Sequence, residues 1–406
     1  MKQSQLFISE SFNIVPNEAE EYYLELCHQL ELSMLVVFGR RSRIAVPKNS
    51  VPVINCYDTF PGDFQEIDSL IFEESTLMEL IFSMIKIARR VLEQVKLFSP
   101  QLIHVSSRPY SGIAALTIKK WLGIPYIIYL TRSEILKFQT NPLLATIMTW
   151  TFQKADAIIV DYENTKTKLC SYNISPQKIH IINPGIDDSF FSPNISNPDI
   201  VEKNQLDNKI VVLSVGFKAT RNLHQQFIKA VKILSNDFPD ICGLVLCNKV
   251  EVEDLKQLVS YLDISRNFIF VVDPTPEELI SLYHSCDTVI IAGNDHSAQE
   301  RKHPLAAGAA SKCVIGGISG NPVEMIQDNM TGFIVDLENP IEISEKLHLL
   351  ITNDSLRLKM GQKGRLWAEN FQWSKQIDKI NAVTNKILSS SMMASEKQGQ
   401  YHSTGN

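Results

Sequence analysis

The sequence predicts an α/β protein built from two parallel-sheet domains. Short apolar runs alternate with longer helical patterns along almost all of its 406 residues. Most of these runs are apolar at every position rather than at every second one, as in strands that helices cover on both faces. Repeated strand–helix–strand units of this kind favour parallel sheets, and the length favours at least two domains.

Thirteen apolar runs are expected to form strands, in two series separated by a polar stretch. The first series comprises Leu6–Ile8, Met34–Phe38, Val51–Asn55, Leu102–Val105, Tyr126–Leu130, Ala157–Val160 and Ile179–Ile182. The second series comprises Ile210–Val215, Gly243–Cys247, Phe268–Val272, Thr288–Ile291, Cys313–Ile315 and Phe333–Val335.

Two of the expected helices have clear sequence signatures. Thr275-Pro276-Glu277-Glu278 has the pattern of a capping box, with proline in the first helical turn. Residues 77–97 form a long amphipathic pattern that carries the basic side chains Lys86, Arg89, Arg90 and Lys96. This basic face predicts either contact with anionic lipid or an ordinary solvated helix surface.

The polar stretch marks the domain boundary. After Asn183–Asp187 comes a Ser-, Pro- and Asn-rich segment, and a new apolar run begins at Ile210. We therefore expect a first domain over residues 1–187, a linker over 188–208 and a second domain from residue 209. Residues 389–406 are rich in Ser, Gln and Gly and are expected to be a disordered tail.

The composition excludes several classes of protein. Hydrophobic residues at 44% and charged residues at 21% are typical of a folded globular chain rather than a disordered one. With 39 Lys and Arg against 45 Asp and Glu, the net charge of −6 argues against a general nucleic-acid binder. The seven cysteines are scattered and without a C-x-x-C pair, so we expect buried thiols and no zinc site.

The expected location is cytoplasmic, with a peripheral position at the inner face of the membrane left open. The amino-terminal segment has only three consecutive apolar residues, too few for a signal peptide. No stretch of about 18 apolar residues is present, so no membrane span is expected.

A Rossmann dehydrogenase would share this pattern of strands and helices. Such an enzyme needs a glycine-rich turn after its first strand, where the backbone approaches a pyrophosphate. The residues that follow Ile8 and Val160 contain no glycine, and the chain has no P-loop. The dehydrogenase hypothesis is therefore excluded.

Several short sequence motifs follow one another in a fixed order from Asn183 onward. They are Asn183-Pro184-Gly185-Ile186-Asp187 with Phe190, Val215-Gly216 with Arg221, Pro276–Tyr283 with Asp287, Ala309–Ile315, Pro322-Val323-Glu324 with Thr331-Gly332, and Phe371-Gln372-Trp373. Together they resemble the retaining glycosyltransferases of the GT-B fold, family 4 (glycosyl transferases group 1). The resemblance covers residues 100–385, and the first hundred residues only weakly.

The resemblance implies the GT-B architecture, in which two Rossmann-like domains have parallel sheets that face each other across a cleft. The first domain would take the acceptor, and residues 209–365 would bind a nucleotide-diphosphate sugar. Residues 366–388 would form a carboxyl-terminal helix that crosses back to the first domain. The reaction would need no metal and no further cofactor, because lysine and arginine can meet the charge of the departing diphosphate.

The family holds that diphosphate after a glycine turn, which Gly216 matches. Its two cationic positions are occupied here by Phe217 and Arg221, with Lys218 beside the first. Lys218 and Arg221 are therefore the candidate diphosphate ligands. The alternative is that both are solvated loop cations.

The family also carries two glutamates with seven residues between them. The second falls on Ala306, so the carboxylate that would hold the ribose is absent. The first falls on Ala298 or, with a small shift, on one of three polar residues: Asp295, His296 and Glu300. We expect Glu300 to contact the reacting sugar, and Asp295 and His296 to line the donor site. An exposed acid that pairs with Arg301 is the alternative for Glu300.

Two further positions complete the candidate site. Thr131 replaces the family's usual histidine. Arg132 and Glu134 follow at the end of the same expected strand, where either side chain could contact the donor or the acceptor. A helix-starting acid is the alternative for Glu134. Glu324 matches a family glutamate on the diphosphate side, and a capping role is its alternative.

The expected function is a retaining hexosyltransferase-type enzyme. It would move a sugar from a nucleotide-diphosphate sugar to a glycan or lipid-linked acceptor, in polysaccharide or glycoconjugate biosynthesis. The alternative is a catalytically degenerate protein that serves as partner or scaffold of another glycosyltransferase. The replacements at Phe217, Ala306 and Thr131 favour that alternative, as does the low count of 17 glycines.

Overall fold

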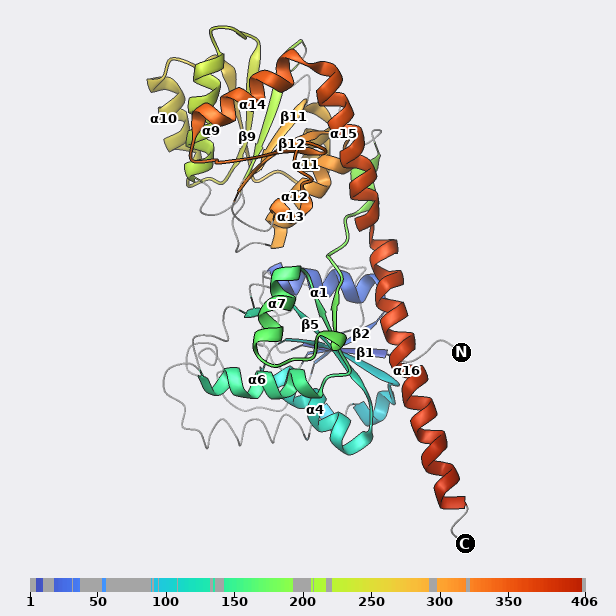
Figure 1. Cartoon of the computed structure of the whole chain (residues 1–406). Coiled ribbons are helices and arrows are strands. Elements are labelled where there is room, and N and C mark those ends of the chain that lie inside the picture. The colour runs from blue at the N-terminus through green and yellow to red at the C-terminus, as the bar shows by residue number, and fades with distance from the viewer. Residues whose placement is uncertain are drawn as a thin grey trace. The chain divides into compact units, whose positions relative to one another are not determined.

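The protein is described here from a computed structural model (Figure 1). The structure describes residues 5–9, 18–30, 32–36, 53–55, 89, 91–93, 95–107, 109–131, 134–135, 142–192, 206, 208–216, 221–291, 298–318 and 322–403. The chain folds into two compact units. The first unit contains Met1–Pro184 and Gln376–Asn406, and the second contains Gly185–Lys375. The first unit is therefore assembled from both ends of the chain.

The first unit is built on a seven-stranded parallel sheet in the order β3-β2-β1-β4-β5-β6-β7. Its strands are β1 (Gln5–Ser9), β2 (Ser33–Val36), β3 (Val53–Asn55), β4 (Leu102–Ser106), β5 (Tyr126–Leu130), β6 (Ala157–Val160) and β7 (Ile179–Ile181). The named α-helices of this unit are α1 (Glu18–Gln29), α4 (Pro109–Leu122), α6 (Pro142–Lys154) and α7 (Glu163–Ser171). Every residue of β4, β5 and β6 is buried, which confirms the prediction from their continuous apolar runs.

The second unit is built on a six-stranded parallel sheet in the order β10-β9-β8-β11-β12-β13. Its strands are β8 (Ile210–Val215), β9 (Ile241–Cys247), β10 (Phe268–Val272), β11 (Thr288–Ile291), β12 (Cys313–Gly317) and β13 (Gly332–Val335). Its α-helices are α9 (Arg221–Leu234), α10 (Val252–Tyr261), α11 (Pro276–Ser285), α12 (Ala298–Ala309), α13 (Pro322–Met325), α14 (Pro340–Thr352) and α15 (Asp354–Ala368).

The helix signatures have mixed outcomes. Thr275 caps α11 as predicted, because its side chain accepts from the backbone of Glu278 while the Glu278 side chain accepts from the backbone of Thr275. Of the amphipathic helix expected over 77–97, only the last part lies within the described residues, and the described positions from Arg89 onward are helical. Lys86 and Arg90 lie outside the described part.

The last helix, α16 (Trp373–Ser403), differs from the prediction at its far end. Residues 389–406 were expected to be a disordered tail, but the helix continues to Ser403. Its buried residues, Gln376, Ile380, Thr384 and Leu388, recur every four positions, so the helix is fixed by packing before this segment begins. The following Met, Ala, Glu, Lys and Gln residues are good helix formers and extend it.

Two passages of chain run between the units, and both are anchored in the second one. The backbone nitrogen of Ile186 donates to the carbonyl of Phe371 at 2.8 Å, and Trp373 donates to Ile186 at 3.4 Å. Arg365 holds the same segment, since it donates to the carbonyl of Phe191 at 2.9 Å. Among the described residues, no helix combines the length and the apolar character that a membrane crossing needs.

Candidate functional site

The order of strands in the second sheet defines where a ligand can bind. From β8 the chain first adds β9 and β10 on one side, and then returns to place β11 on the other side. The switch point therefore lies between β8 and β11. In open parallel sheets, ligands bind outside the carboxyl ends of the strands at this point.

Two helices begin at the switch point. Val215 pairs with Ile291, so β8 and β11 reach the carboxyl edge at the same level. The chain leaves β8 through Gly216 and enters α9 at Arg221, and it leaves β11 and enters α12 at Ala298. A helix amino terminus carries unpaired N–H groups and partial positive charge, so two of them beside each other favour an anionic ligand.

The predicted site residues belong to these two connections. Gly216 is buried and directly follows β8. Arg221 is the first residue of α9 and Glu300 is the third residue of α12, although their side chains lie outside the described part. Outside it altogether lie Phe217, Lys218, Asp295 and His296. The structure thus brings the backbone of Gly216, Arg221 and Glu300 to one edge of the sheet.

Beneath the turn at Gly216 lies a buried histidine. His224, in the first turn of α9, is fully buried, and its Nδ1 lies 2.9 Å from the hydroxyl oxygen of Ser214 in β8. Desolvation lowers the pKa of His224 to about 4, which keeps the ring neutral. The contact with Ser214 ties α9 to β8 below the candidate site.

Position 306 in helix α12, where the family's second glutamate would fall, is part of the buried core. Ala306 is 1% exposed, so the missing carboxylate is replaced by a core side chain. Two residues later, a Cβ on Gly308 would lie 2.7 Å from the carbonyl oxygen of Gly364 in α15. Ser311 ends the helix with a φ of 60°, a left-handed conformation that favours glycine. A glutamate at 306 would therefore have to enter a packed helix face.

Glu324 is the predicted carboxylate of the second unit whose burial the structure describes. It is exposed and lies on the short helix α13, behind β12. Its position at the carboxyl edge is the one that the resemblance implies. The contribution of Glu324 to ligand binding stays a prediction.

In the first unit, Glu134 caps the turn that follows β5. Its Oε2 accepts from the backbone nitrogen and the hydroxyl of Thr131, both at 3.0 Å, and from the hydroxyl of Tyr23 at 2.8 Å. These bonds support the capping role that was the alternative for Glu134. Arg132 lies outside the described residues.

Glu134 nevertheless keeps one oxygen that the cap does not use. Oε1 is buried and has no hydrogen-bond partner among the described residues, and the same is true of the hydroxyl of Ser107 after β4. The two strands are neighbours in the sheet, so both atoms lie at its carboxyl edge. No local sequence pattern links a residue of α1 to one after β5, so the Tyr23 contact was not predicted.

Two family models match successive parts of the chain. Residues 58–190 match the model described as Glycosyltransferase Family 4, and residues 196–367 match Glycosyl transferases group 1. Together these matches cover most of the chain and divide it in the polar stretch between the two sheets. The chain belongs to this family of glycosyltransferases, and the predicted family is confirmed.

Curated relatives agree with the family models. The chain is 24% identical over 250 residues to D-inositol 3-phosphate glycosyltransferase from Corynebacterium glutamicum, covering 58% of this chain and 58% of that protein. It is 26% identical over 261 residues to human alpha-1,3/1,6-mannosyltransferase ALG2, covering 59% and 61%. The chain thus spans somewhat more than half the length of the curated relatives it matches.

Solved structures share the fold over nearly the whole chain. HepE from Anabaena, solved in complex with UDP, has a TM-score of 0.73 at 13% identity and covers 95% of this chain and 100% of its own. Sucrose-phosphate synthase from Thermosynechococcus elongatus has a TM-score of 0.68 at 15% identity, covering 96% and 100%. The predicted fold, two Rossmann-like domains of the GT-B type, is confirmed.

Proposed function

We propose that this protein is a retaining glycosyltransferase that uses a nucleotide-diphosphate sugar as donor. The observation that carries the proposal is the pairing of Val215 with Ile291, which brings the amino termini of α9 and α12 to one edge of the second sheet. That edge offers donors and positive potential where a diphosphate would gain charge as it leaves. The UDP in the HepE structure supports a nucleotide of this class.

Each predicted residue has a role in this proposal. Lys218 and Arg221 meet the diphosphate, and the turn at Gly216 lets the backbone approach it. Asp295, His296 and Glu324 line the donor site, and Glu300 with Arg132 lies near the reacting sugar. The acceptor is a hydroxyl of a glycan or of a lipid-linked saccharide, in glycoconjugate or polysaccharide synthesis. Metal independence, the hexose and the cytoplasmic location stay predictions.

The test is calorimetric titration of the full chain with UDP, GDP and ADP. We expect one of them to bind, and Arg221→Ala to weaken that binding tenfold or more, since a charged hydrogen bond contributes about 1.5–3 kcal/mol. Arg266→Ala is the matched control, because Arg266 is exposed in the turn that leads into β10, at the opposite edge of the same sheet. It should leave the affinity unchanged.

Two outcomes contradict the proposal. If no nucleoside diphosphate binds, the degenerate partner role that Ala306 and Phe217 suggest becomes the better hypothesis. If Arg221→Ala and Arg266→Ala weaken binding equally, the site is not at the switch point. Once a donor is found, the coupling constant of the anomeric proton in the product distinguishes retention from inversion.

A further inference from the structure

The amino edge of the first sheet, opposite its candidate functional edge, gathers four chain segments. They are residues 96–101 before β4, 117–125 before β5, 150–156 before β6 and 168–178 before β7. Three of these segments are in direct contact, and β4 links the first to them. Ile103 donates to the carbonyl of Pro125 at 3.0 Å, and Lys119 donates to the carbonyl of Lys154 at 2.9 Å. Lys178 donates to the carbonyls of Gln153 and Ala155 at 2.9 and 3.0 Å. We call this surface the basic edge.

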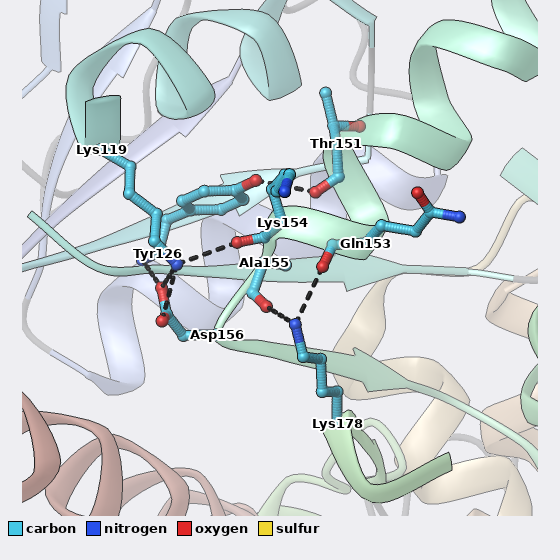
Figure 2. Close-up of polar contacts among 8 residues, drawn as sticks. All are labelled: Lys119, Tyr126, Thr151, Gln153, Lys154, Ala155, Asp156 and Lys178. Carbon is cyan, nitrogen blue, oxygen red and sulfur yellow. Dashed lines mark hydrogen bonds and ion pairs between the residues drawn. The ribbon is translucent and has the colours of Figure 1, made fainter. Parts of the chain in front are cut away.

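Figure 2 shows the framework of the basic edge. The Lys119 ammonium lies 2.8 Å from both carboxylate oxygens of Asp156, and Asp156 also accepts from the backbone nitrogen of Tyr126 at 2.9 Å. Lys178 neutralises the carbonyl end of α6, and desolvation together with the charge of Lys119 lowers the Lys178 pKa. Lys119, Lys178 and Asp156 therefore serve the fold and are not available to a partner.

Among the described residues of the basic edge, lysines outnumber acids. The four segments contain six lysines and one acid, Asp156, in a chain whose net charge is −6. The side chains of Lys96, Lys120 and Lys154 are exposed, and among the described residues none of them has a carboxylate within ion-pair distance. Capping of helix ends explains Lys119 and Lys178 but not these three.

The same surface exposes large apolar side chains. Leu97 is 79% exposed and Trp121 is 74% exposed. Each directly follows an exposed lysine, Lys96 or Lys120. Phe98 and Trp150 are 38% and 53% exposed, and Trp150 lies one turn before Lys154 on α6. Exposed tryptophan among lysines is the composition of a protein surface that meets the boundary between lipid headgroups and acyl chains.

We propose that the basic edge docks on an anionic phospholipid surface, with Trp121 and Leu97 entering the headgroup region while Lys96, Lys120 and Lys154 meet lipid phosphates. A second copy of this chain is a poorer occupant, because pairing two such edges would bring like charges together. The surface includes the end of the amphipathic segment 77–97, for which the sequence left lipid contact open, and it lies wholly within the first unit. The proposal does not depend on the reaction proposed above.

The test is co-sedimentation of the full chain with vesicles of phosphatidylcholine, with and without phosphatidylglycerol. We expect binding to the vesicles that contain phosphatidylglycerol, and weaker binding as salt rises. A lysine near such a surface contributes about fivefold in affinity, so Lys96→Gln, Lys120→Gln and Lys154→Gln together should reduce binding about a hundredfold. Trp121→Ser should weaken binding further at high salt, where the apolar contribution remains.

Matched controls lie in the second unit. Lys229 on α9 is exposed and Tyr261 on α10 is 87% exposed, so Lys229→Gln and Tyr261→Ser repeat the same changes elsewhere. These variants should bind vesicles as the unmodified chain does. Circular dichroism of the triple lysine variant should be unchanged, because the lysines that bind the fold's own carbonyls are left in place.

Three results would overturn the proposal. The first is absence of binding to either vesicle, and the second is an equal loss in the control variants. The third is a dimer that Trp121→Ser dissolves, because the surface would then belong to a second copy. Titration of the triple variant with nucleoside diphosphates separates the two proposals, since the basic edge should not affect nucleotide affinity.

Discussion

Glu134 illustrates how one buried side chain can join two elements of the first unit. Its Oε2 receives the hydroxyl of Tyr23 from α1 and two groups of Thr131 from the end of β5. The same Tyr23 hydroxyl also lies 3.1 Å from the carbonyl oxygen of Tyr129, so its single proton is shared between the carboxylate and the strand. A carboxylate with only 6% exposure depends on such bonds to remain buried.

Glu134→Gln should therefore lower the free energy of unfolding by about 2 kcal/mol, the value of a hydrogen bond to a buried charge. Urea unfolding of the full chain, followed by circular dichroism, measures the change. Tyr23→Phe removes only one of the bonds and should have a smaller effect in the same direction. An unfolding midpoint that Glu134→Gln leaves unchanged would contradict this description of the cap.

Residue roles were the least predictable level. The family resemblance placed Thr131 and Glu134 together at a strand end, because they are close in the sequence. It could not identify Tyr23, which lies 111 residues from Glu134 along the chain. Nor could it tell that Ser311 takes the left-handed conformation of a helix end, since a Ser in that conformation leaves no sequence signal comparable to glycine.

At the scale of elements, the two chain segments that connect the units meet where Gly185 lies against Trp373. A Cβ on Gly185 would lie 2.3 Å from Cδ2 of Trp373, far inside van der Waals contact. Glycine is required there because the indole of Trp373 occupies the space that any side chain would need. Trp373 is itself 6% exposed, so it has little room to move aside.

Gly185→Ala should lower the free energy of unfolding by about 1–3 kcal/mol, the usual cost of overpacking. Trp373→Leu in the same chain should recover part of that loss, and a double-mutant cycle measures the coupling. Gly123→Ala supplies the control, because a Cβ at that position would meet nothing within 4 Å. Its φ of 72° makes alanine unfavourable there, and this loss of stability should be the same whether residue 373 is Trp or Leu. Strict additivity of Gly185→Ala with Trp373→Leu would show that the contact has no energetic role.

Strands were the most predictable elements. All thirteen expected runs correspond to strands of the two sheets, because a strand buried on both faces leaves a run of apolar residues without interruption. The far end of α16 was missed for the opposite reason. Its sequence is polar and rich in Ser, so only the packed positions that precede it reveal the helix.

At the scale of the whole molecule, three buried histidines couple stability to pH. His104 bonds to the Tyr129 hydroxyl at 2.8 Å, His224 to the Ser214 hydroxyl at 2.9 Å and His303 to the Tyr283 hydroxyl at 2.6 Å. Desolvation lowers the pKa of His104 and His303 to about 3 and that of His224 to about 4. All three are therefore neutral when folded at pH values where an unfolded histidine is already protonated.

The stability that these histidines contribute should consequently be constant above pH 6.5 and fall as the pH decreases from 6.5 towards 4. In that window the unfolded chain binds protons that the folded chain does not, and each histidine contributes about 1.4 kcal/mol per pH unit. Urea unfolding at a series of pH values measures the slope. His104→Gln should reduce the slope by one such contribution, whereas replacement of the exposed His348 should leave it unchanged. A flat profile between pH 6.5 and 4.5 would contradict the prediction.

The division of the chain into units has a consequence for its synthesis. The first unit is completed by residues 376–406, whereas the second unit is continuous from Gly185 to Lys375. At about 5–20 residues per second, a ribosome needs about 10–40 s to make the intervening segment. During that interval the nascent first unit lacks α16, and the apolar groups that Ile380 and Leu388 will cover are open to water. A chaperone that protects this uncovered surface until release from the ribosome would act on the first unit and not on the second.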